Sequence, residues 1–292
     1  MKLFNEVALE DNKVDLNKLD IYLPSIAQEG MVNDLIDRIK GVFGTIKDLL
    51  TSNSLDNSIK NDVPLTTLIT NINKEIEIIK KYPNQNDIPK IIYNLKNALV
   101  SVPNGFNGDL EGLIKSLLGL SQIVYRAHHG AITKLNTTLS VYVSNKDHRK
   151  ATETFKKDIV GLQALNAQIN KNISKFFEHK AGSSNMLRYT DIVDNYNSFI
   201  KEIYEVEKLA KANNFADVLQ AHGEITKTIE LIDLFIKETS SDSNIEANYI
   251  KNISIYTAEV AKTTEALSRV RFTSELAIKL YGNLVNILLK AL

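Results

Sequence analysis

The side chains best suited to bind a metal ion or to move a proton are five histidines, and their spacing matches neither of two common metal-binding patterns. They are His128, His129, His148, His179 and His222. None has a carboxylate three residues before it, as in the Glu-x-x-His pattern of di-iron bundles, and the chain has no His-Glu-x-x-His sequence. Neighbouring side chains on a helix point about 100° apart, so one metal ion cannot take both His128 and His129. We therefore predict no metal site, and we expect this pair to have a structural role beside Gly130.

The glycines and carboxylates give no stronger sign of an active site. Gly41-Val-Phe-Gly44 and Gly105-Phe-Asn-Gly108 have neither the spacing nor the following Lys-Ser or Lys-Thr of a phosphate-binding loop, and we expect no strand before either. The chain has no Gly-x-Ser-x-Gly sequence, which marks the nucleophile of many hydrolases. Glu202, Glu205 and Glu207 fit the solvated face of a helix. The sequence therefore predicts a protein that is not an enzyme and uses no cofactor.

A group of basic residues near the middle of the chain is the best candidate for binding a macromolecule. It consists of Lys146, Arg149, Lys150, Lys156 and Lys157. On a helix, positions 146, 149, 150, 153 and 157 share one face, where Glu153 interrupts the positive charge. Such a face can contact nucleic-acid phosphates. Few aromatic residues are interleaved, so stacking on single-stranded bases is not indicated.

Charge is unevenly distributed, although the formal net charge of the 292 residues is zero. Residues 126–180 contain ten Lys and Arg against four Asp and Glu, whereas residues 187–248 contain six against twelve. One interpretation is that the two segments are antiparallel neighbours with complementary charges, or are simply solvated faces. The other is that a basic and an acidic face drive head-to-tail assembly, or that the basic face contacts nucleic acid. The zero net charge predicts no overall attraction to nucleic acid or anionic lipid.

The composition also bears on disulfides and membranes. The chain has no cysteine, so it has no disulfide, thiolate metal site or cysteine nucleophile. No run of 18 apolar residues occurs, and the acidic residues within 1–11 do not fit a secretory leader. The apolar stretch 110–125 could insert into a membrane as part of a helical toxin, but it is short and carries Glu111 and Lys115. We expect a buried bundle helix there and no membrane partner.

Apolar residues recur every three or four positions from about Met31 to Leu292, which predicts an all-α protein. We expect helices over 31–50, 64–81, 88–100, 109–144, 147–180, 187–211, 214–239 and 244–290. Pro64 and Pro89 suit first helical turns, and the segment 103–108 is the clearest break. The last helix would reach roughly 65–70 Å. The prediction is an elongated multi-helix bundle with long antiparallel helices, divided into an N-terminal arm (1–30), a short-helix subdomain (31–104) and a long-helix bundle (105–292).

The opening Phe4-Asn5-Glu6-Val7-Ala8-Leu9-Glu10 resembles the start of virion proteins of giant tailed bacteriophages. The head protease of such phages cuts after a small residue, any residue and then Glu. Ala8, Leu9 and Glu10 match that pattern, so cleavage would come before Asp11. The resemblance covers about ten of the 292 residues. It implies a virion protein or an internal head protein without enzymatic activity.

These observations predict a non-enzymatic virion structural or internal protein that acts through extended helical surfaces. Its expected partners are other virion proteins or further copies of itself, and its expected location is the virion or the cytoplasm of the infected host. The alternative is a phage-encoded protein that binds RNA or DNA through the basic segment 126–180. A helical pore-forming toxin is the weaker third possibility.

Overall fold

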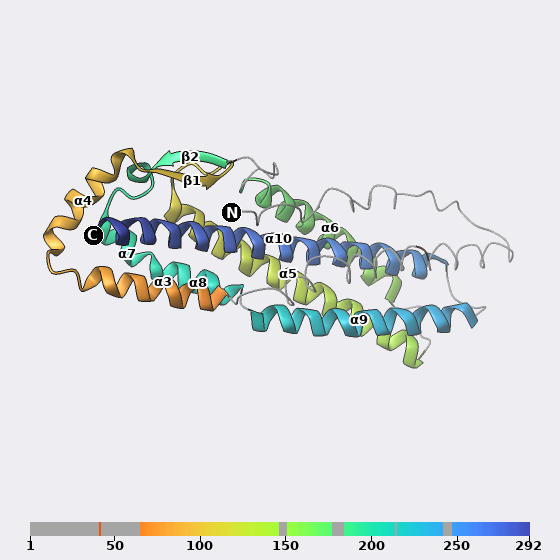
Figure 1. Ribbon diagram of the computed structural model, residues 1–292. Helices are drawn as coiled ribbons and strands as arrows, with labels where there is room; N and C mark the ends of the chain where they lie inside the picture. Colours follow the sequence, from red (N-terminus) through yellow and green to blue (C-terminus); the bar gives the residue numbers. More distant parts are fainter. Residues whose placement is uncertain (1–40, 42–64, 146–150, 177–183, 214, 242–246) are drawn as a thin grey trace. The chain divides into compact units, whose positions relative to one another are not determined.

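The computed structural model of the protein describes residue 41 and residues 65–145, 151–176, 184–213, 215–241 and 247–292 (Figure 1). These residues are mainly helical, with a single two-stranded sheet among them, so the predicted all-α class is confirmed. The long helices are α5 (Leu110–Asn145), α6 (Ala151–Ile173), α9 (Phe215–Ser241) and α10 (Ala247–Ala291). The shorter ones are α3 (Leu65–Lys80), α4 (Ile88–Asn94), α7 (Tyr196–Lys201) and α8 (Ile203–Ala212). The predicted arm 1–30 and nearly all of the predicted helix 31–50 lie outside the described residues.

The chain folds as two compact units, each assembled from segments that are distant in sequence. The described residues of unit 1 are residue 41 and those within 126–168 and 220–265. The described residues of unit 2 lie within 58–125, 169–219 and 266–292. This division differs from the predicted consecutive ranges 31–104 and 105–292. The reason is that α5, α6, α9 and α10 each contribute residues to both units. Contacts between helices therefore group residues by their position along a helix rather than by their order in the chain.

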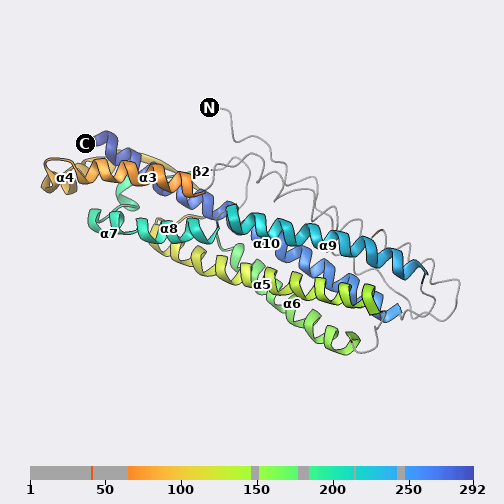
Figure 2. The same ribbon diagram turned by 90° about the horizontal axis from the view of Figure 1, so that it is seen from below.

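In unit 1, α5 and α9 run in the same direction, and α6 and α10 run in the opposite direction (Figures 1 and 2). The contacts between α5 and α9 follow one another in parallel order. His129 pairs with Glu224, Asn136 with Thr228, and Tyr142 with Phe235. The α5 part of the basic segment and the α9 part of the acidic segment thus meet along parallel helices, so the interpretation of the two segments as antiparallel neighbours is wrong for this pair.

The core of unit 1 contains three aromatic rings from three helices. Tyr142 of α5, Phe235 of α9 and Tyr249 of α10 are all buried. The ring centroids are 5.0 Å apart for Tyr142 and Phe235, 5.6 Å for Tyr142 and Tyr249, and 6.3 Å for Phe235 and Tyr249. Aromatic pairs at such distances and tilts add to the stabilisation from apolar burial. These rings hold α5, α9 and α10 together in unit 1.

Unit 2 has its own core around the C-terminal part of α10. Ile278, Tyr281, Val285 and Leu288 recur every three or four residues and are all buried, as a helix with one core-facing stripe requires. Two hydroxyl groups are satisfied within this core. Tyr281 donates to the carbonyl of Phe199 at 2.6 Å, and Tyr189 donates to the carbonyl of Leu284 at 3.1 Å.

The prediction of a helix over 88–100 is wrong for the second half of that range. Helix α4 ends at Asn94, a 3₁₀ turn covers Leu95–Asn97, and strand β1 covers Leu99–Pro103. Val100 and Val102 are buried while Leu99 and Ser101 are exposed, so side chains alternate with the period of two typical of a strand. β-branched valines at the buried positions favour that conformation. Four residues of alternation are short enough to be read as the end of an amphipathic helix.

The loop expected at 182–185 and the single helix expected over 187–211 are also wrong. Strand β2 (Ser184–Arg188) pairs antiparallel with β1, with Val100 opposite Leu187. A 3₁₀ turn (Tyr189–Asp191) follows, and then α7 and α8. The side chain of Asn195 accepts a hydrogen bond from the amide of Ser198 at 3.1 Å, which places the start of α7 there rather than at 187. The predicted positions of α3, α5, α9 and α10 are confirmed to within a few residues.

Candidate functional site

The predicted basic cluster lies only partly within the described residues. Outside them fall Lys146, Arg149 and Lys150, and also Ala8, Leu9 and Glu10 of the possible cleavage motif. Lys156 and Lys157 are exposed on α6. The only Asp or Glu between 156 and 175 is Asp158, and its carboxylate forms an ion pair with Lys134 of α5 at 3.0 Å. The described part of α6 therefore presents positive charge to solvent, while the grouping of all five basic residues stays a prediction.

His128 and His129 have different surroundings although they are neighbours on α5. His129 is exposed, and its Nδ1 lies 2.9 Å from a carboxylate oxygen of Glu224. His128 is only 1% exposed, and neither ring nitrogen has a hydrogen-bond partner among the described residues. Burial is the main cause that lowers the pKa of His128 to about 4, and the nearby His129 adds to it. Helix α5 continues through Gly130, so the pair marks no helix end.

A buried polar contact joins α6 to α10 in unit 1. The side-chain amide of Asn166 donates to the carboxylate of Glu259 at 2.8 Å and to its backbone carbonyl at 3.0 Å. Lys262, one turn further along α10, pairs with the same carboxylate at 2.7 Å. Glu259 is therefore buried with a donor on each side, which is the condition under which a buried carboxylate is stable.

Glu202 joins two helices of unit 2. Its amide donates to the carbonyl of Ser198 at 3.1 Å at the end of α7, and its carbonyl accepts from the amide of Val206 at 3.0 Å in the first turn of α8. We call residues 198–206 the Glu202 junction. The two helices meet here without an intervening loop, so Glu202 lies in the backbone of both.

The side chain of Glu202 is partly buried among other carboxylates. Its Oε2 atom is inaccessible to solvent and has no hydrogen-bond partner among the described residues. Burial is the largest cause that raises the pKa of Glu202 to about 7, and the charges of Glu111, Asp194 and Asp109 raise it further. Lys115 lowers this pKa less than those causes raise it. The ammonium group of Lys115 is hydrogen-bonded to Glu111, which is its main electrostatic partner.

The expectation that Glu202, Glu205 and Glu207 share a solvated face is therefore wrong for this group. Glu205 pairs with Lys208 at 2.9 Å, and Glu207 accepts a hydrogen bond from Asn73 of α3 at 2.7 Å. Their contacts leave Glu202 as the one of the three with a buried oxygen that has no donor among the described residues. Nothing in the spacing 202, 205, 207 distinguishes the buried member, because the α7–α8 junction changes which side of the chain faces the core.

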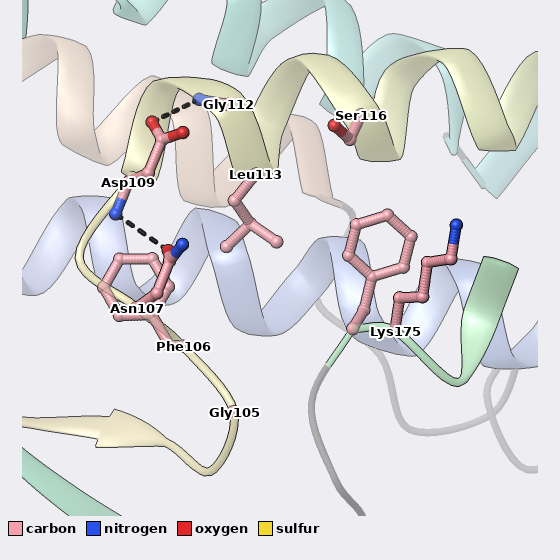
Figure 3. Close-up of a pocket in the computed structure, with 9 residues that line it drawn as sticks. Gly105, Phe106, Asn107, Asp109, Gly112, Leu113, Ser116 and Lys175 are labelled. Atoms are coloured by element: carbon pink, nitrogen blue, oxygen red, sulfur yellow. Dashed lines mark hydrogen bonds between the residues drawn. The ribbon is translucent and has the colours of Figure 1, made fainter.

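A hollow of about 240 Å³ opens beside the loop between β1 and α5 (Figure 3). Its lining consists of Gly105, Phe106, Asn107, Asp109, Gly112, Leu113, Ser116, Lys175 and Phe176. Strand β1 ends at Pro103, two residues before Gly105. The expectation that no strand precedes Gly105-Phe-Asn-Gly108 is therefore wrong. Gly108 has a φ of +98°, and a Cβ atom there would lie 2.9 Å from the carbonyl oxygen of Asp191, so the turn requires glycine.

The order strand, glycine loop and helix is that of a phosphate-binding loop, but the first turn of α5 is already occupied. The carboxylate of Asp109 accepts a hydrogen bond from the amide of Gly112 at 2.8 Å, and Asn107 accepts one from the amide of Asp109 at 3.1 Å (Figure 3). Asp109 thus satisfies the free amide and places negative charge where a phosphate would bind. This hollow is a capped helix start rather than an anion site, and Glu202 is not among the residues that line it.

Two kinds of feature are absent from the described residues: a group of metal-binding side chains and a membrane-spanning helix. Among the described residues, no three His, Asp or Glu side chains are grouped so that they could hold a metal ion. None of the described helices is both long and apolar enough to cross a membrane. In the apolar stretch 110–125, Leu110, Ile114, Leu117 and Val124 are buried in unit 2 as helix-core residues.

The comparisons with known proteins add no relative. No protein-family model matches the chain, and neither a curated protein nor a solved structure matches it.

Proposed function

We propose that the protein is a non-enzymatic structural or internal component of a large tailed phage particle and that it acts through the outer faces of its helices. The observation that carries the proposal is the distribution of side chains in unit 1. Polar groups such as Asn166, Glu259 and Thr228 are buried between helices. Large apolar side chains lie outside: Val141 of α5 is 44% exposed, Val160 of α6 is 65% exposed and Leu234 of α9 is 45% exposed.

Exposed aliphatic side chains on helices favour contact with other protein surfaces, because burying them there removes apolar area from water. The polar contacts that hold the helices together are already made inside the unit, so the outer faces are available for partners. The N-terminal resemblance supplies the particle as the setting. Other virion proteins or further copies of the chain are the expected partners.

Mass spectrometry of purified particles tests this proposal. We expect to find the protein in the particles, with an N-terminal peptide beginning at Asp11 if residues 8–10 are a cleavage site. Val160→Asp should reduce incorporation into particles, because it places a charge on an apolar contact. Gln168→Asp, at an exposed position on the same helix, is the matched control and should leave incorporation unchanged. Absence of the wild-type protein from particles rejects the proposal.

A second candidate function is binding to RNA or DNA, and the surface of α6 favours it. Lys156 and Lys157 are exposed in unit 1, and the nearby carboxylate of Asp158 is paired with Lys134. Neutralising phosphates releases counterions, so binding through lysines should weaken steeply with salt. Gel-shift assays across a salt series measure that slope.

Charge reversal separates a specific basic face from general attraction. Reversing Lys146, Arg149 and Lys150 together with Lys156 and Lys157 should make the salt slope shallower by about 0.9 for each phosphate that is no longer neutralised. Reversal of Lys227 and Lys237 on α9, both exposed, is the control and should not change the slope. Unchanged binding after the first set of reversals would exclude this face. Dye release from liposomes tests the toxin alternative, and we expect none.

A further inference from the structure

We propose that the Glu202 junction is a proton-sensitive element of the fold: α7 and α8 pack tightly when the Glu202 carboxyl is protonated, and the junction loosens when that carboxyl ionises. The proposal does not depend on the proposed function.

The carboxyl group of Glu202 lies where its charged form is poorly stabilised. Oε2 of Glu202 is inaccessible to solvent and accepts no hydrogen bond from the described residues. An ionised carboxylate in that place has lost water contacts without gaining a donor, which costs free energy. A protonated carboxyl avoids that cost, because it carries no charge. The geometry therefore favours the protonated form in the packed state and the ionised form in a state that admits water.

The charges that face Glu202 are mostly negative. The start of α5 contributes Asp109, Glu111 and Lys115, and the segment before α7 contributes Asp194. Three of these four groups are negative, and the ammonium group of Lys115 is hydrogen-bonded to Glu111. Like charges nearby disfavour a further carboxylate.

Two more elements pack around the same group. Helix α8 contributes Glu205, which is paired with Lys208. After the main effect of Glu111, the negative charges of Glu205 and Glu202 also raise the pKa of Lys115. Helix α10 contributes Tyr281, and the negative charge of Glu202 helps to raise the pKa of its hydroxyl, after burial as the main cause. Tyr281 therefore stays neutral across the pH range in question. The pKa of Glu202 is the one that burial and these charges raise to about 7.

The Glu202 junction is connected to neighbouring helices on two sides. Ionisation acts on the single residue between α7 and α8, about one turn after Phe199. The carbonyl of Phe199 accepts a hydrogen bond from the hydroxyl of Tyr281 at 2.6 Å. On the other side, α8 packs against α3, and Glu207 accepts from Asn73 at 2.7 Å. A change at Glu202 therefore reaches contacts with α10 and with α3.

The pKa of Glu202, raised to about 7, places the change near neutral pH. An acid whose pKa is higher in the packed state than in the open state stabilises the packed state most at low pH. That stabilisation is lost as the pH rises from the ordinary value of 4.5 through about 7. The junction should therefore be tightest in mildly acidic solution and loosest above neutral pH.

The experiment combines a titration with hydrogen exchange on the full chain. In protein labelled with ¹³C at the glutamate carboxyl carbons, one resonance should titrate with a midpoint near pH 7, and Glu202→Gln should remove it. In exchange measurements corrected for intrinsic rates, the amides of residues 198–206 should open on the order of tenfold more at pH 8.5 than at pH 5.5. Glu202→Gln, which mimics the protonated form, should show the same protection at both values.

Two further variants keep the test decisive. Glu111→Gln removes a nearby negative charge and frees Lys115, so it should lower the titration midpoint of Glu202 without changing Glu202 itself. Glu230→Gln, at an exposed position of α9 in unit 1, should leave both readouts as in the wild type. A Glu202 midpoint near 4.5 would overturn the proposal. So would pH-dependent exchange of residues 198–206 that persists in Glu202→Gln.

Discussion

The two units differ in part in how they bury their polar groups. In unit 1, side chains of different helices bond to one another, as Asn166 does with Glu259 and Thr228 with Asn136. In unit 2, two tyrosine hydroxyls donate to backbone carbonyls, as Tyr281 does to Phe199, beside one buried side-chain pair, Asn213 with Ser121. Each unit also has one group whose ionised form is disfavoured by burial and that has a polar atom without a hydrogen-bond partner among the described residues: His128 in unit 1 and Glu202 in unit 2.

This difference gives the two units opposite responses to pH. The folded-state pKa of His128 is below its ordinary value, so unit 1 loses stability as the pH falls from 6.5 through about 4. The folded-state pKa of Glu202 is above its ordinary value, so unit 2 loses stability as the pH rises from 4.5 through about 7. The two groups therefore contribute stability at opposite ends of the pH range, His128 to unit 1 above about pH 6.5 and Glu202 to unit 2 below about pH 4.5, and hydrogen exchange resolved by peptide can follow the two units separately.

The largest expected effect tests whether the units are separately stable. Phe235→Ala in unit 1 and Phe199→Ala in unit 2 each remove a buried ring, which typically costs about 3–5 kcal/mol. Phe235→Ala should speed amide exchange in residues 126–145 and 223–241, and Phe199→Ala should speed it in residues 65–80 and 196–212. If either variant speeds exchange equally in both units, the units unfold as one and the comparison between them fails.

The next effect concerns His128. At pH 5 the imidazole of His128 is mostly charged in the unfolded chain and mostly neutral in the folded protein. This difference should lower the free energy of unfolding of unit 1 by about 2 kcal/mol relative to pH 8. His128→Leu should remove this loss and leave the stability at pH 8 nearly unchanged or higher, because neither ring nitrogen has a partner among the described residues. The measurement is urea denaturation at both pH values. His129→Leu, at the exposed neighbour, is the control and should retain the loss.

The sequence predicts the long helices well because their apolar residues repeat over many turns. In α10, buried residues recur every three or four positions from Tyr249 to Leu288. Buried Thr and Ser side chains of this helix donate hydrogen bonds to carbonyls of the preceding turn, as Thr257 does to Ile253. Short elements carry too few repeats for such a pattern. Strand β1 has four alternating residues before Pro103, and its partner β2 lies more than 80 positions later in the chain.

The candidate sites are harder to predict for a related reason. Burial of one glutamate among Glu202, Glu205 and Glu207 depends on which helices approach it, and the three carboxylates that raise its pKa come from 109–111 and 194. Similarly, His128 and His129 look equivalent in the sequence, but α9 offers Glu224 to one and leaves the other buried. Local spacing shows which residue types are present, whereas their pKa values are set by segments distant in sequence.

The two ways of satisfying buried groups can be compared directly by removing one donor from each. Asn166→Ala leaves Glu259 with Lys262 as its remaining side-chain donor among the described residues, and Tyr281→Phe leaves the carbonyl of Phe199 without its hydroxyl. Each should cost about 1–3 kcal/mol, the usual penalty for an unsatisfied buried group. Asn170→Ala and Tyr204→Phe, both exposed, are the controls and should stay within about 0.5 kcal/mol in denaturant titrations.

The smallest expected effect should be the same in both units, because it depends on helix propensity alone. Gly119 and Gly130 both lie inside α5, one in unit 2 and one in unit 1, and a Cβ atom at either would meet nothing within 4 Å. Alanine at each should therefore stabilise the protein by roughly 0.5–1 kcal/mol. Gly108→Ala is the opposite case, since its φ of +98° and the nearby carbonyl of Asp191 should make alanine destabilising. If Gly119→Ala and Gly130→Ala differ clearly in thermal denaturation, the two halves of α5 are not equally helical, and the pH contrast between the units would then reflect local helix stability as well as His128 and Glu202.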